Sequence, residues 1–176
     1  MARPGREWCL TLPRERRGPA AMLRCDVVAW DTDRWRTARA LQMEVLRPNG
    51  PLPGDAVPTA DWLMLGAWAD GGGLVGSAAV CPESWPRPDL AIVPEPAWHF
   101  RSLAVLPEFR GTGIGSALVR ECCAAAWWHG ASGIWAEARV AALSLYRRAD
   151  WTVAGDEWHK SGVGPHRFVW RTLPDS

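Results

Sequence analysis

A glycine-rich segment at residues 110–118, reading R-G-T-G-I-G-S-A-L, stands between an apolar run and a helical pattern. The run at 100–106 has the character of a strand, and the residues after the segment have helical spacing. The first N–H groups of a helix have no intrahelical partner, and the helix dipole adds positive charge there. Glycines let the backbone approach an anion without a Cβ in the way. The segment therefore predicts a strand, a phosphate-binding turn and a helix in succession.

Two common phosphate-binding loops fit this segment poorly. The P-loop of nucleotide-binding proteins needs a Lys after its last Gly, and the only Lys of the chain is Lys160. The dinucleotide-binding loop needs G-x-G-x-x-G and an acidic residue about 20 residues later. Here the order is G-x-G-x-G, and no acidic residue lies between positions 121 and 137. The pattern that remains is R-x-x-G-x-G, formed by Arg110, Gly113 and Gly115.

This pattern resembles the acetyl-CoA pyrophosphate loop of the GNAT superfamily of N-acetyltransferases. A second segment, 138–151, is similar to a helix that GNAT enzymes place after the next strand, reading approximately N-x-x-A-x-x-L-Y-x-x-x-G-F. Three positions agree and an aromatic residue stands at the last, as Ala142, Leu145, Tyr146 and Trp151. Arg139 replaces the usual Asn, and Asp150 replaces the usual Gly. Because Asp tolerates the left-handed backbone conformation better than most residues, we expect the turn after the helix to be kept.

The resemblance implies that acetyl-CoA is the cosubstrate and that no metal takes part. Main-chain amides at 111–116 would hold the pyrophosphate, and the Arg110 side chain would add charge-assisted hydrogen bonds. The backbone at 103–105 would pair with the pantetheine arm as an added strand does. The cofactor-binding residues implied in this way are Leu103, Ala104, Val105, Arg110, Gly111, Thr112, Gly113, Ile114, Gly115, Ser116 and Arg139.

The same resemblance singles out two residues for catalysis. Tyr146, the only tyrosine of the chain, falls where GNAT enzymes place the general acid for the departing CoA thiolate. The alternative is a tyrosine packed at the helix end with its hydroxyl bonded locally. An amine with a pKa of about 10.4 must lose a proton before it attacks, so a base is expected. Glu137, at the end of a strand facing the cleft, is the first candidate, and His99, Glu95 and His166 are the others.

Composition bounds the class of protein. With 176 residues and 48% hydrophobic content, the chain has the size of one domain, expected at 22–176 after a basic, flexible arm at 1–21. A net charge of +1 gives no reason to expect nucleic acid or a membrane as a partner. No apolar run approaches the roughly 20 residues that span a bilayer. Five Cys, without C-x-x-C spacing, predict reduced, buried thiols in a cytoplasmic protein, and a catalytic Cys is the alternative.

The order of elements predicts a mixed α/β (α+β) fold. Strands are expected at 23–30, 61–69, 74–80, 98–106, 134–137, 151–157 and 167–172, and helices at 34–46, 113–130 and 140–149. Asp31 or Thr32 is expected to cap the first helix. This order is close to that of GNAT proteins, whose central sheet is mostly antiparallel, covered by helices on both faces and splayed at the acetyl-CoA site. Pro-rich loops at 47–60 and 81–97 match nothing in that family.

Together these expectations predict an N-acetyltransferase that moves an acetyl group from acetyl-CoA, by direct attack, to a primary amine of a small molecule or peptide. The alternative is a catalytically inactive acyl-CoA-binding regulatory module, because the glycine-rich turn would serve both. A longer acyl donor is also compatible with the sequence, and the family resemblance allows a homodimer. The acceptor itself is not predicted, since the segments expected to form its pocket match nothing.

Overall fold

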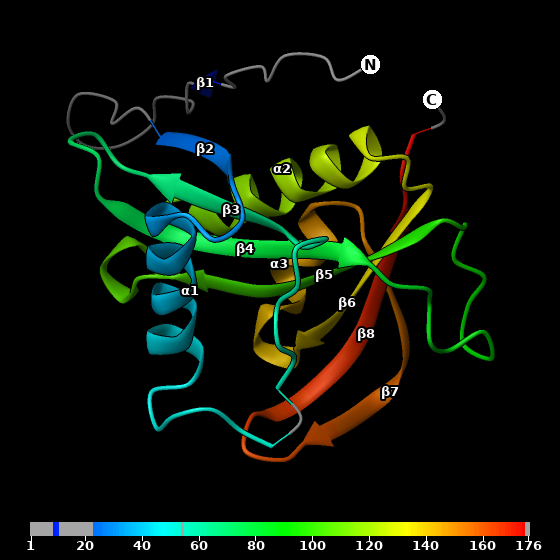
Figure 1. Cartoon of the computed structure of the whole chain (residues 1–176). Coiled ribbons are helices and arrows are strands. Elements are labelled where there is room, and N and C mark those ends of the chain that lie inside the picture. Colours follow the sequence, from blue (N-terminus) through cyan, green and yellow to red (C-terminus); the bar gives the residue numbers. More distant parts are fainter. Residues whose placement is uncertain (1–8, 11–22, 54, 175–176) are drawn as a thin grey trace.

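One twisted sheet of eight strands forms the framework of the molecule (Figure 1). The computed structural model of the chain describes residues 9–10, 23–53 and 55–174. The strands lie side by side in the order β1-β2-β3-β4-β5-β6-β8-β7. Their bounds are β1 Cys9–Leu10, β2 Leu23–Val28, β3 Leu63–Trp68, β4 Leu74–Pro82, β5 Ala97–Val105, β6 Gly133–Arg139, β7 Thr152–Lys160 and β8 Gly164–Thr172.

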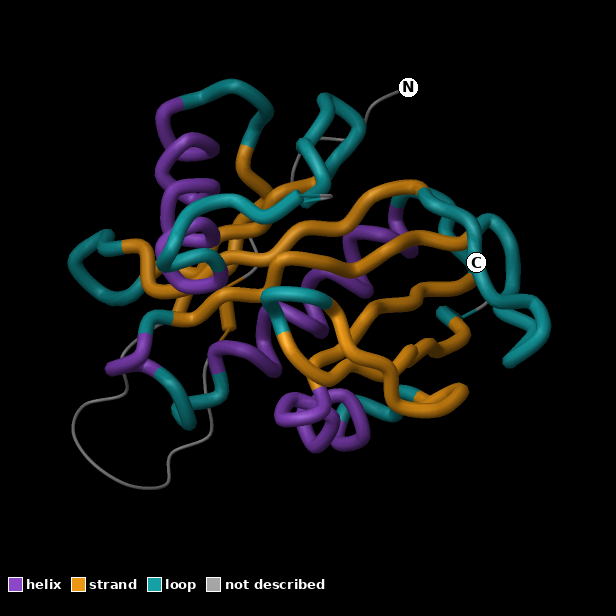
Figure 2. The backbone as a smooth tube through the Cα atoms, turned by 90° about the horizontal axis from the view of Figure 1, so that it is seen from below, coloured by secondary structure: helices purple, strands orange, loops and turns teal. Residues whose placement is uncertain are grey.

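Helices cover both faces of this sheet. The helices and 3-10 turns of the described residues are α1 Asp33–Leu46, η1 Pro107–Phe109, α2 Ile114–Trp128, η2 Val140–Ala142 and α3 Leu143–Arg148. Figure 2 shows α1 on one side of the strands and α2 and α3 on the other. The predicted order of elements and the mixed fold are therefore confirmed, although the helix predicted at 140–149 begins as a 3-10 turn. Within the described ranges, no helix is long and apolar enough to cross a membrane.

The only parallel neighbours in this sheet are β5 and β6, and they soon part. Their register pairs Ala97 with Gly133, Trp98 with Ile134 and His99 with Trp135. Beyond these pairs, β5 and β6 each continue without a partner on the side that they had shared. Because parallel strands end at the same edge, the two carboxyl ends enclose an open wedge. The predicted splay of the central sheet is confirmed.

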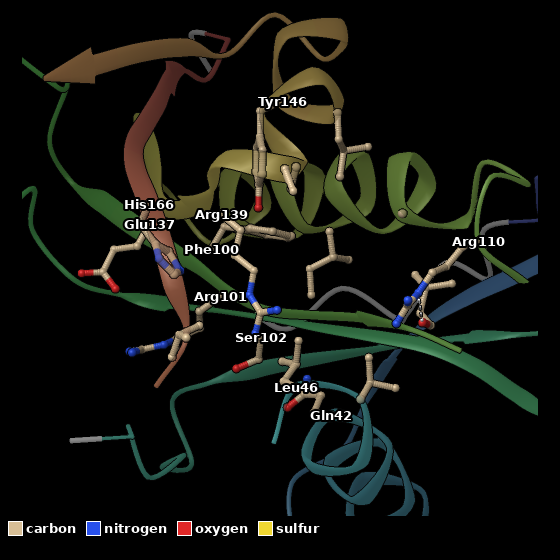
Figure 3. A pocket seen from close by; sticks show the side chains of 18 of the residues that line it. Gln42, Leu46, Phe100, Arg101, Ser102, Arg110, Glu137, Arg139, Tyr146 and His166 are labelled. Atoms are coloured by element: carbon tan, nitrogen blue, oxygen red, sulfur yellow. Dashed lines mark hydrogen bonds between the residues drawn. The ribbon is translucent and has the colours of Figure 1, made fainter. Parts of the chain in front are cut away.

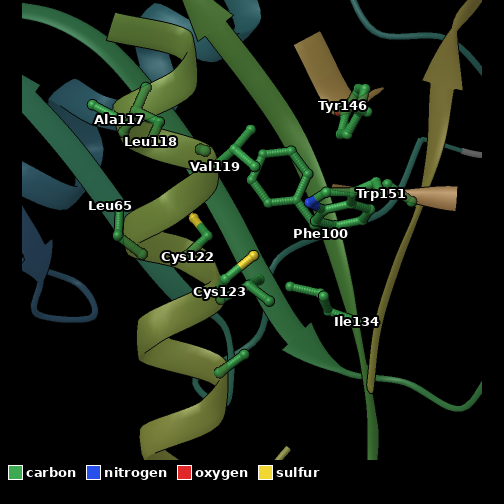
Figure 4. Packing of buried hydrophobic residues seen from close by; sticks show 14 of the residues in the cluster. Leu65, Phe100, Ala117, Leu118, Val119, Cys122, Cys123, Ile134, Tyr146 and Trp151 are labelled. Atoms are coloured by element: carbon green, nitrogen blue, oxygen red, sulfur yellow. The ribbon is translucent and has the colours of Figure 1, made fainter. Parts of the chain in front are cut away.

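Helix α2 packs its apolar face onto one side of the sheet (Figure 4). Ile114, Leu118 and Cys122, which follow one another at intervals of four residues, form a buried stripe, with no member more than 5% exposed. It belongs to a core that also contains Phe100 of β5 and Ile134 of β6. Burying apolar surface of this kind contributes about 25 cal/mol per Å². The packing therefore fixes α2 against the strands and holds its first turn beside the open end of β5.

Four cysteines lie in the core. Cys25, Cys81, Cys122 and Cys123 are buried and free. Burial raises the pKa of Cys25 and Cys81 to about 11 and that of Cys123 to about 12. Such thiols stay protonated at neutral pH and are poor nucleophiles. For these four residues the prediction of buried, hydrophobic cysteines is confirmed, and none of them supports a catalytic Cys.

Local signals in the sequence mark two helix ends correctly. Thr32 caps α1, because its Oγ1 accepts a hydrogen bond of 3.2 Å from the N–H of Trp35. Asp150 takes a left-handed φ of 60° after α3, as expected where it replaces Gly.

The last hairpin is longer than predicted, since β7 reaches Lys160 and β8 begins at Gly164. The arm predicted at 1–21 lies outside the described residues except for β1, which pairs with β2.

Candidate active site

A pocket of about 820 Å³ opens where β5 and β6 separate (Figure 3). Helix α1 and the residues after it border one side, and the glycine-rich turn, η2 and α3 border the other. Ala104, Thr112 and Ile114 do not line it, although each lies beside a residue that does. All other predicted catalytic and cofactor-binding residues line it, namely Leu103, Val105, Arg110, Gly111, Gly113, Gly115, Ser116, Glu137, Arg139 and Tyr146.

The glycine-rich turn contains two glycines in the left-handed backbone conformation. The φ angles of Gly111 and Gly113 are 77° and 93°. In this region an ordinary side chain costs roughly 1–2 kcal/mol. The Thr112 hydroxyl between them donates a hydrogen bond of 2.6 Å to the carbonyl of Phe109, which ties the turn to η1. The turn is therefore fixed by its own sequence.

The first turn of α2 is left with free hydrogen-bond donors. No side chain caps the helix at Gly113, and the first intrahelical bond runs from the N–H of Ala117 to the carbonyl of Gly113 at 3.0 Å. The N–H groups of 114–116 consequently have no intrahelical partner. This turn contains no acidic residue to offset the helix dipole. Arg110, whose Nε donates to the Val105 carbonyl at 3.2 Å, adds a cation nearby. The arrangement suits an anion.

Strand β5 carries a β-bulge where it passes the pocket. Ser102 has a φ of 58°, and the register with β4 shifts between Ser77 and Ala79. A bulge interrupts the alternation of side chains between the two faces, so consecutive residues at 99–103 line the pocket. Among the residues that the structure describes, the edge of β5 toward the wedge has no strand partner after His99. Its backbone groups are therefore open to a ligand.

Tyr146 has a buried ring and a free hydroxyl. The ring packs edge-on against Trp151 and Phe100, with centroid separations of 5.3 and 6.1 Å. The hydroxyl points into the pocket (Figure 3) and makes no hydrogen bond within the part of the chain that the structure describes. Desolvation raises the pKa of Tyr146 above its ordinary value. The hydroxyl therefore remains protonated at neutral pH and is available to a ligand as a donor.

The carboxylate of Glu137 lines the pocket but is already paired. Lys160 at the end of β7 donates to its Oε2 at 2.5 Å, and both side chains are partly exposed. The ion pair with Lys160 therefore occupies a carboxylate oxygen that a base would use to accept a proton. Glu137 is therefore placed at the site predicted for a base, but in an environment that disfavours this role.

His99 stands at the point where the two strands part. Its Nδ1 lies 3.0 Å from Oε2 of Glu83, and its ring stacks on Trp135 at a centroid distance of 3.7 Å. Because a carboxylate only accepts, we assign the ring proton to Nδ1, which leaves Nε2 as an acceptor. Nε2 has no protein partner in the described residues. Burial lowers the pKa of His99, so the ring is neutral at pH 7.

The two remaining candidate bases have different surroundings. His166 on β8 also lines the pocket, and its Nδ1 lies 2.8 Å from the carbonyl of Gly164. Burial lowers the pKa of His166 as well. Glu95 does not line the pocket. Its carboxylate accepts a hydrogen bond of 2.7 Å from the N–H of Ala97, which gives it a structural part in the loop before β5.

The α1 side of the pocket holds residues that the sequence did not single out. Gln42 is only 1% exposed, and its Nε2 donates to Ser77 Oγ on β4 at 3.1 Å. The guanidinium of Arg47 donates to both carboxylate oxygens of Asp55, at 2.5 and 2.7 Å. Gln42 follows the apolar positions 38 and 41 at helical spacing, and this pattern could have placed it on the buried face of α1. The Arg47–Asp55 pair joins a helix end to a loop without any local motif.

The sequence of the chain matches known acetyltransferases over much of its length. The family described as Acetyltransferase (GNAT) domain matches residues 62–153. The uncharacterized N-acetyltransferase YitI of Bacillus subtilis (strain 168) is 27% identical over 112 residues, which are 64% of this chain and 72% of that protein. Residues 62–153, which match the family, contain the glycine-rich turn and Tyr146.

Solved structures share the fold. Escherichia coli ElaA superposes with a TM-score of 0.64 at 16% identity, over 86% of this chain and 99% of that chain. The ribosomal-protein-S18-alanine N-acetyltransferase from Escherichia coli gives a TM-score of 0.64 at 15% identity, over 88% and 96% of the two chains. At this level of identity, the likeness concerns the arrangement of helices and strands.

The Arg47–Asp55 pair should contribute to stability in a pH-dependent way. Arg47 lowers the pKa of Asp55 from 3.8 to about 2. The contribution is therefore present above pH 4 and lost as the pH falls toward 2. We expect Asp55→Asn to lower the free energy of unfolding by about 1 kcal/mol at pH 7, because solvent screens part of the interaction. Urea denaturation between pH 2 and pH 7 would measure it.

The matched control is Asp89→Asn, which removes an exposed ion pair with Arg87 outside the pocket. Because an exposed pair is screened, this variant should leave the unfolding free energy nearly unchanged. An Asp55→Asn effect that is equal at pH 3 and pH 7 would contradict the assignment to the ionised carboxylate.

Proposed function

The chain belongs to the GNAT acetyltransferase family, and we propose that it transfers an acetyl group from acetyl-CoA to a primary amine of a small molecule or peptide. The amine nitrogen attacks the thioester carbon directly, the carbon–sulfur bond breaks, and CoA leaves as the thiolate. The observation that carries this proposal is the unpartnered Tyr146 hydroxyl, pointing into the wedge next to the open edge of β5. A purely structural tyrosine would satisfy its hydroxyl locally.

In this proposal the glycine-rich turn binds the diphosphate of the donor. The free N–H groups at 114–116 and the positive end of α2 supply the attraction. The guanidinium of Arg110 has nitrogen atoms left after its bond to Val105, and these would add charge-assisted bonds. The open edge of β5 would accept the pantetheine arm through backbone hydrogen bonds, as in strand addition. A backbone N–H there would also stabilise the oxyanion.

Tyr146 would act on the departing sulfur. A phenol hydroxyl aimed at the developing thiolate stabilises its charge and can then supply the proton. The raised pKa keeps the hydroxyl protonated but makes early proton transfer unfavourable. Hydrogen bonding to the sulfur would therefore precede the transfer of the proton.

We assign the base to His99 in preference to Glu137. At pH 7 an amine of pKa about 10.4 is almost entirely protonated, and deprotonation costs on the order of 4–5 kcal/mol. Neutral His99 offers a free Nε2, and Glu83 behind it would stabilise the imidazolium that forms. Glu137 is tied to Lys160 by a 2.5 Å ion pair. The combination of an oriented imidazole and a carboxylate is the better arrangement for accepting a proton.

Gly115→Ala tests the binding of the donor diphosphate. An added Cβ would lie 3.7 Å from Leu145 and would meet no close protein atom, so the fold does not require Gly at this position. We expect unchanged or slightly higher stability, because Ala is the better helix former. We also expect at least a tenfold loss of acetyl-CoA affinity by calorimetry, because the Cβ would crowd the diphosphate. Unchanged affinity would place the diphosphate elsewhere.

Tyr146→Phe tests the role of the hydroxyl. Since the ring contacts are kept, we expect acetyl-CoA to bind normally while kcat falls at least tenfold in a thiol-release assay. A variant with normal turnover would remove Tyr146 from catalysis. If the wild-type protein binds acetyl-CoA but releases no CoA with any of a broad panel of amines, the inactive acyl-CoA-binding module becomes the better description.

His99→Gln tests the base. We expect kcat/KM to fall at least tenfold at pH 7 and the rise of kcat/KM between pH 5 and pH 7 to disappear, because the imidazole proposed as the base is no longer there to titrate. His166→Gln is the matched variant, and it should keep that rise. The opposite outcome, with the rise lost only in His166→Gln, would transfer the role to His166.

A further inference from the structure

We infer that the acceptor is an amine with an anionic group close to its nitrogen, most simply an α-amino carboxylate, and that Arg139 and Arg39 bind this group. The inference rests on the proposed function, because it concerns the second substrate of the same pocket. It goes further, since it selects zwitterionic acceptors and disfavours polycationic ones.

The lining of the pocket is rich in positive charge. Of the groups that are charged at neutral pH, only two lining residues are acidic, Asp55 and Glu137. Seven are basic, namely Arg39, Arg47, Arg101, Arg110, Arg139, Arg148 and Lys160. An approaching amine is itself cationic at neutral pH, so this lining would repel an acceptor that carried only positive charge.

Three of these cations are already matched by carboxylates. Arg47 is paired with Asp55 at 2.5 Å, and Lys160 with Glu137 at 2.5 Å. Arg101 lies 3.3 Å from Glu83, just outside the pocket lining. The positive charge available to a ligand therefore comes from the remaining arginines.

The unmatched arginines come from different walls of the pocket. Arg110 lies at the end formed by the glycine-rich turn, far from Glu137 and His166 (Figure 3). Arg148 follows Tyr146 on α3, on the same side of the pocket as that turn. These two suit the phosphates of the donor. Arg139 and Arg39 come from β6 and α1 and also line the pocket. We assign both to the acceptor, although the family resemblance implied that Arg139 contacts the donor.

Arg139 is a cation without an anionic partner. Its side chain makes no ion pair or hydrogen bond to any described residue. Its guanidinium lies in the middle of the pocket, between the Tyr146 hydroxyl and Ser102 of β5 (Figure 3). Burial lowers its pKa, and neighbouring Arg47 and Arg110 lower it further. An anion bound here would relieve both effects and would pair with the planar guanidinium through two hydrogen bonds.

Arg39 is in a similar state on the opposite wall. The only hydrogen bond of its side chain in the described residues is 3.3 Å long and goes to the neutral Oε1 of Gln42. Desolvation lowers its pKa, the carboxylate of Asp55 opposes this effect, and Arg47 and Arg101 lower the pKa further. Because Gln42 is anchored to Ser77, Arg39 is held toward the pocket by a fixed neighbour. It is therefore a second preorganised donor for an anion.

The central place of Arg139 limits where the anion sits on the acceptor. The guanidinium and the Tyr146 hydroxyl, where the proposed reaction occurs, both point into the same pocket (Figure 3). An anion bound there must be only a few bonds from the attacking nitrogen, as in an α-amino acid or the free N-terminus of a short peptide of similar geometry. The same positive charge also favours the neutral amine, which helps the deprotonation step.

A matched acceptor series tests this inference. Each amino acid is compared with its amide and its decarboxylated amine, and O-phosphoethanolamine with ethanolamine, in a thiol-release assay with acetyl-CoA. We expect kcat/KM for the best amino acid to exceed that of its amide at least tenfold. A preference for the phosphorylated amine instead would identify phosphate as the anion. Equal rates for acid and amide, or a preference for polyamines, would overturn the inference.

Two variants separate recognition from folding. Arg139→Gln and Arg39→Gln should each lower kcat/KM for the anionic acceptor at least tenfold and change that for its amide much less, so that the ratio collapses. Arg120→Gln, on the exposed face of α2 and outside the pocket, should leave the ratio unchanged. Equal losses for acid and amide in the pocket variants would indicate a structural role and contradict the inference.

Binding measurements keep this test independent of turnover. In the presence of CoA, calorimetry should show that N-acetyl amino acids bind at least tenfold more tightly than their amides, and that Arg139→Gln removes the difference. If no amine is acetylated but this difference is found, the proposed function fails and the anion site stands. If transfer occurs only to amines that lack an anionic group and no difference in affinity is found, the proposed function stands and the anion site fails.

Discussion

The short contact between β5 and β6 is the constraint on which the rest of the site depends. Parallel pairing ends with His99 and Trp135, although both strands go on. Continued pairing would close the sheet and leave no pocket. The bulge at Ser102 then directs consecutive residues of β5 into the gap, and the packing of α2 holds a helix N-terminus beside it. Backbone geometry, more than any single side chain, therefore creates the site.

Electrostatics gives this site its character. Two ion pairs, Arg47–Asp55 and Lys160–Glu137, fix charged groups on the rim without adding net charge. The first turn of α2 and the unmatched arginines leave the interior positive. Within this field, the neutral imidazole of His99, the proposed base, carries one proton on Nδ1 and can accept a second at Nε2. A positive pocket that contains a neutral base would suit anionic ligands that carry a nucleophilic amine.

The sequence predicted most of the fold because its signals are local. The glycine-rich turn, the Thr32 cap and the α2 stripe each depend on residues within a few positions of one another. The Tyr146 hydroxyl reached the pocket as the family resemblance implied. Long-range pairing could not be predicted in the same way. Lys160 lies 23 residues from Glu137, and Glu83 lies 16 residues from His99, so neither partner was foreseeable without knowledge of which strands are neighbours. The same is true of Arg39 and Asp55, which stand in segments with no recognisable motif.

The buried amide of Gln42 has a consequence for the order of events in the pocket. It joins α1, which borders the acceptor, to Ser77 of β4, and Ser77 is the register partner of Ala104 on the donor strand. In the proposed function, an acceptor beside α1 and a donor beside β5 would therefore lie at opposite ends of this hydrogen-bonded link. If one ligand disturbs this link, the binding free energy of the other ligand changes. By thermodynamic linkage, each ligand then changes the binding free energy of the other by the same amount. Bisubstrate kinetics in such a molecule is a property of the scaffold as well as of the two binding surfaces.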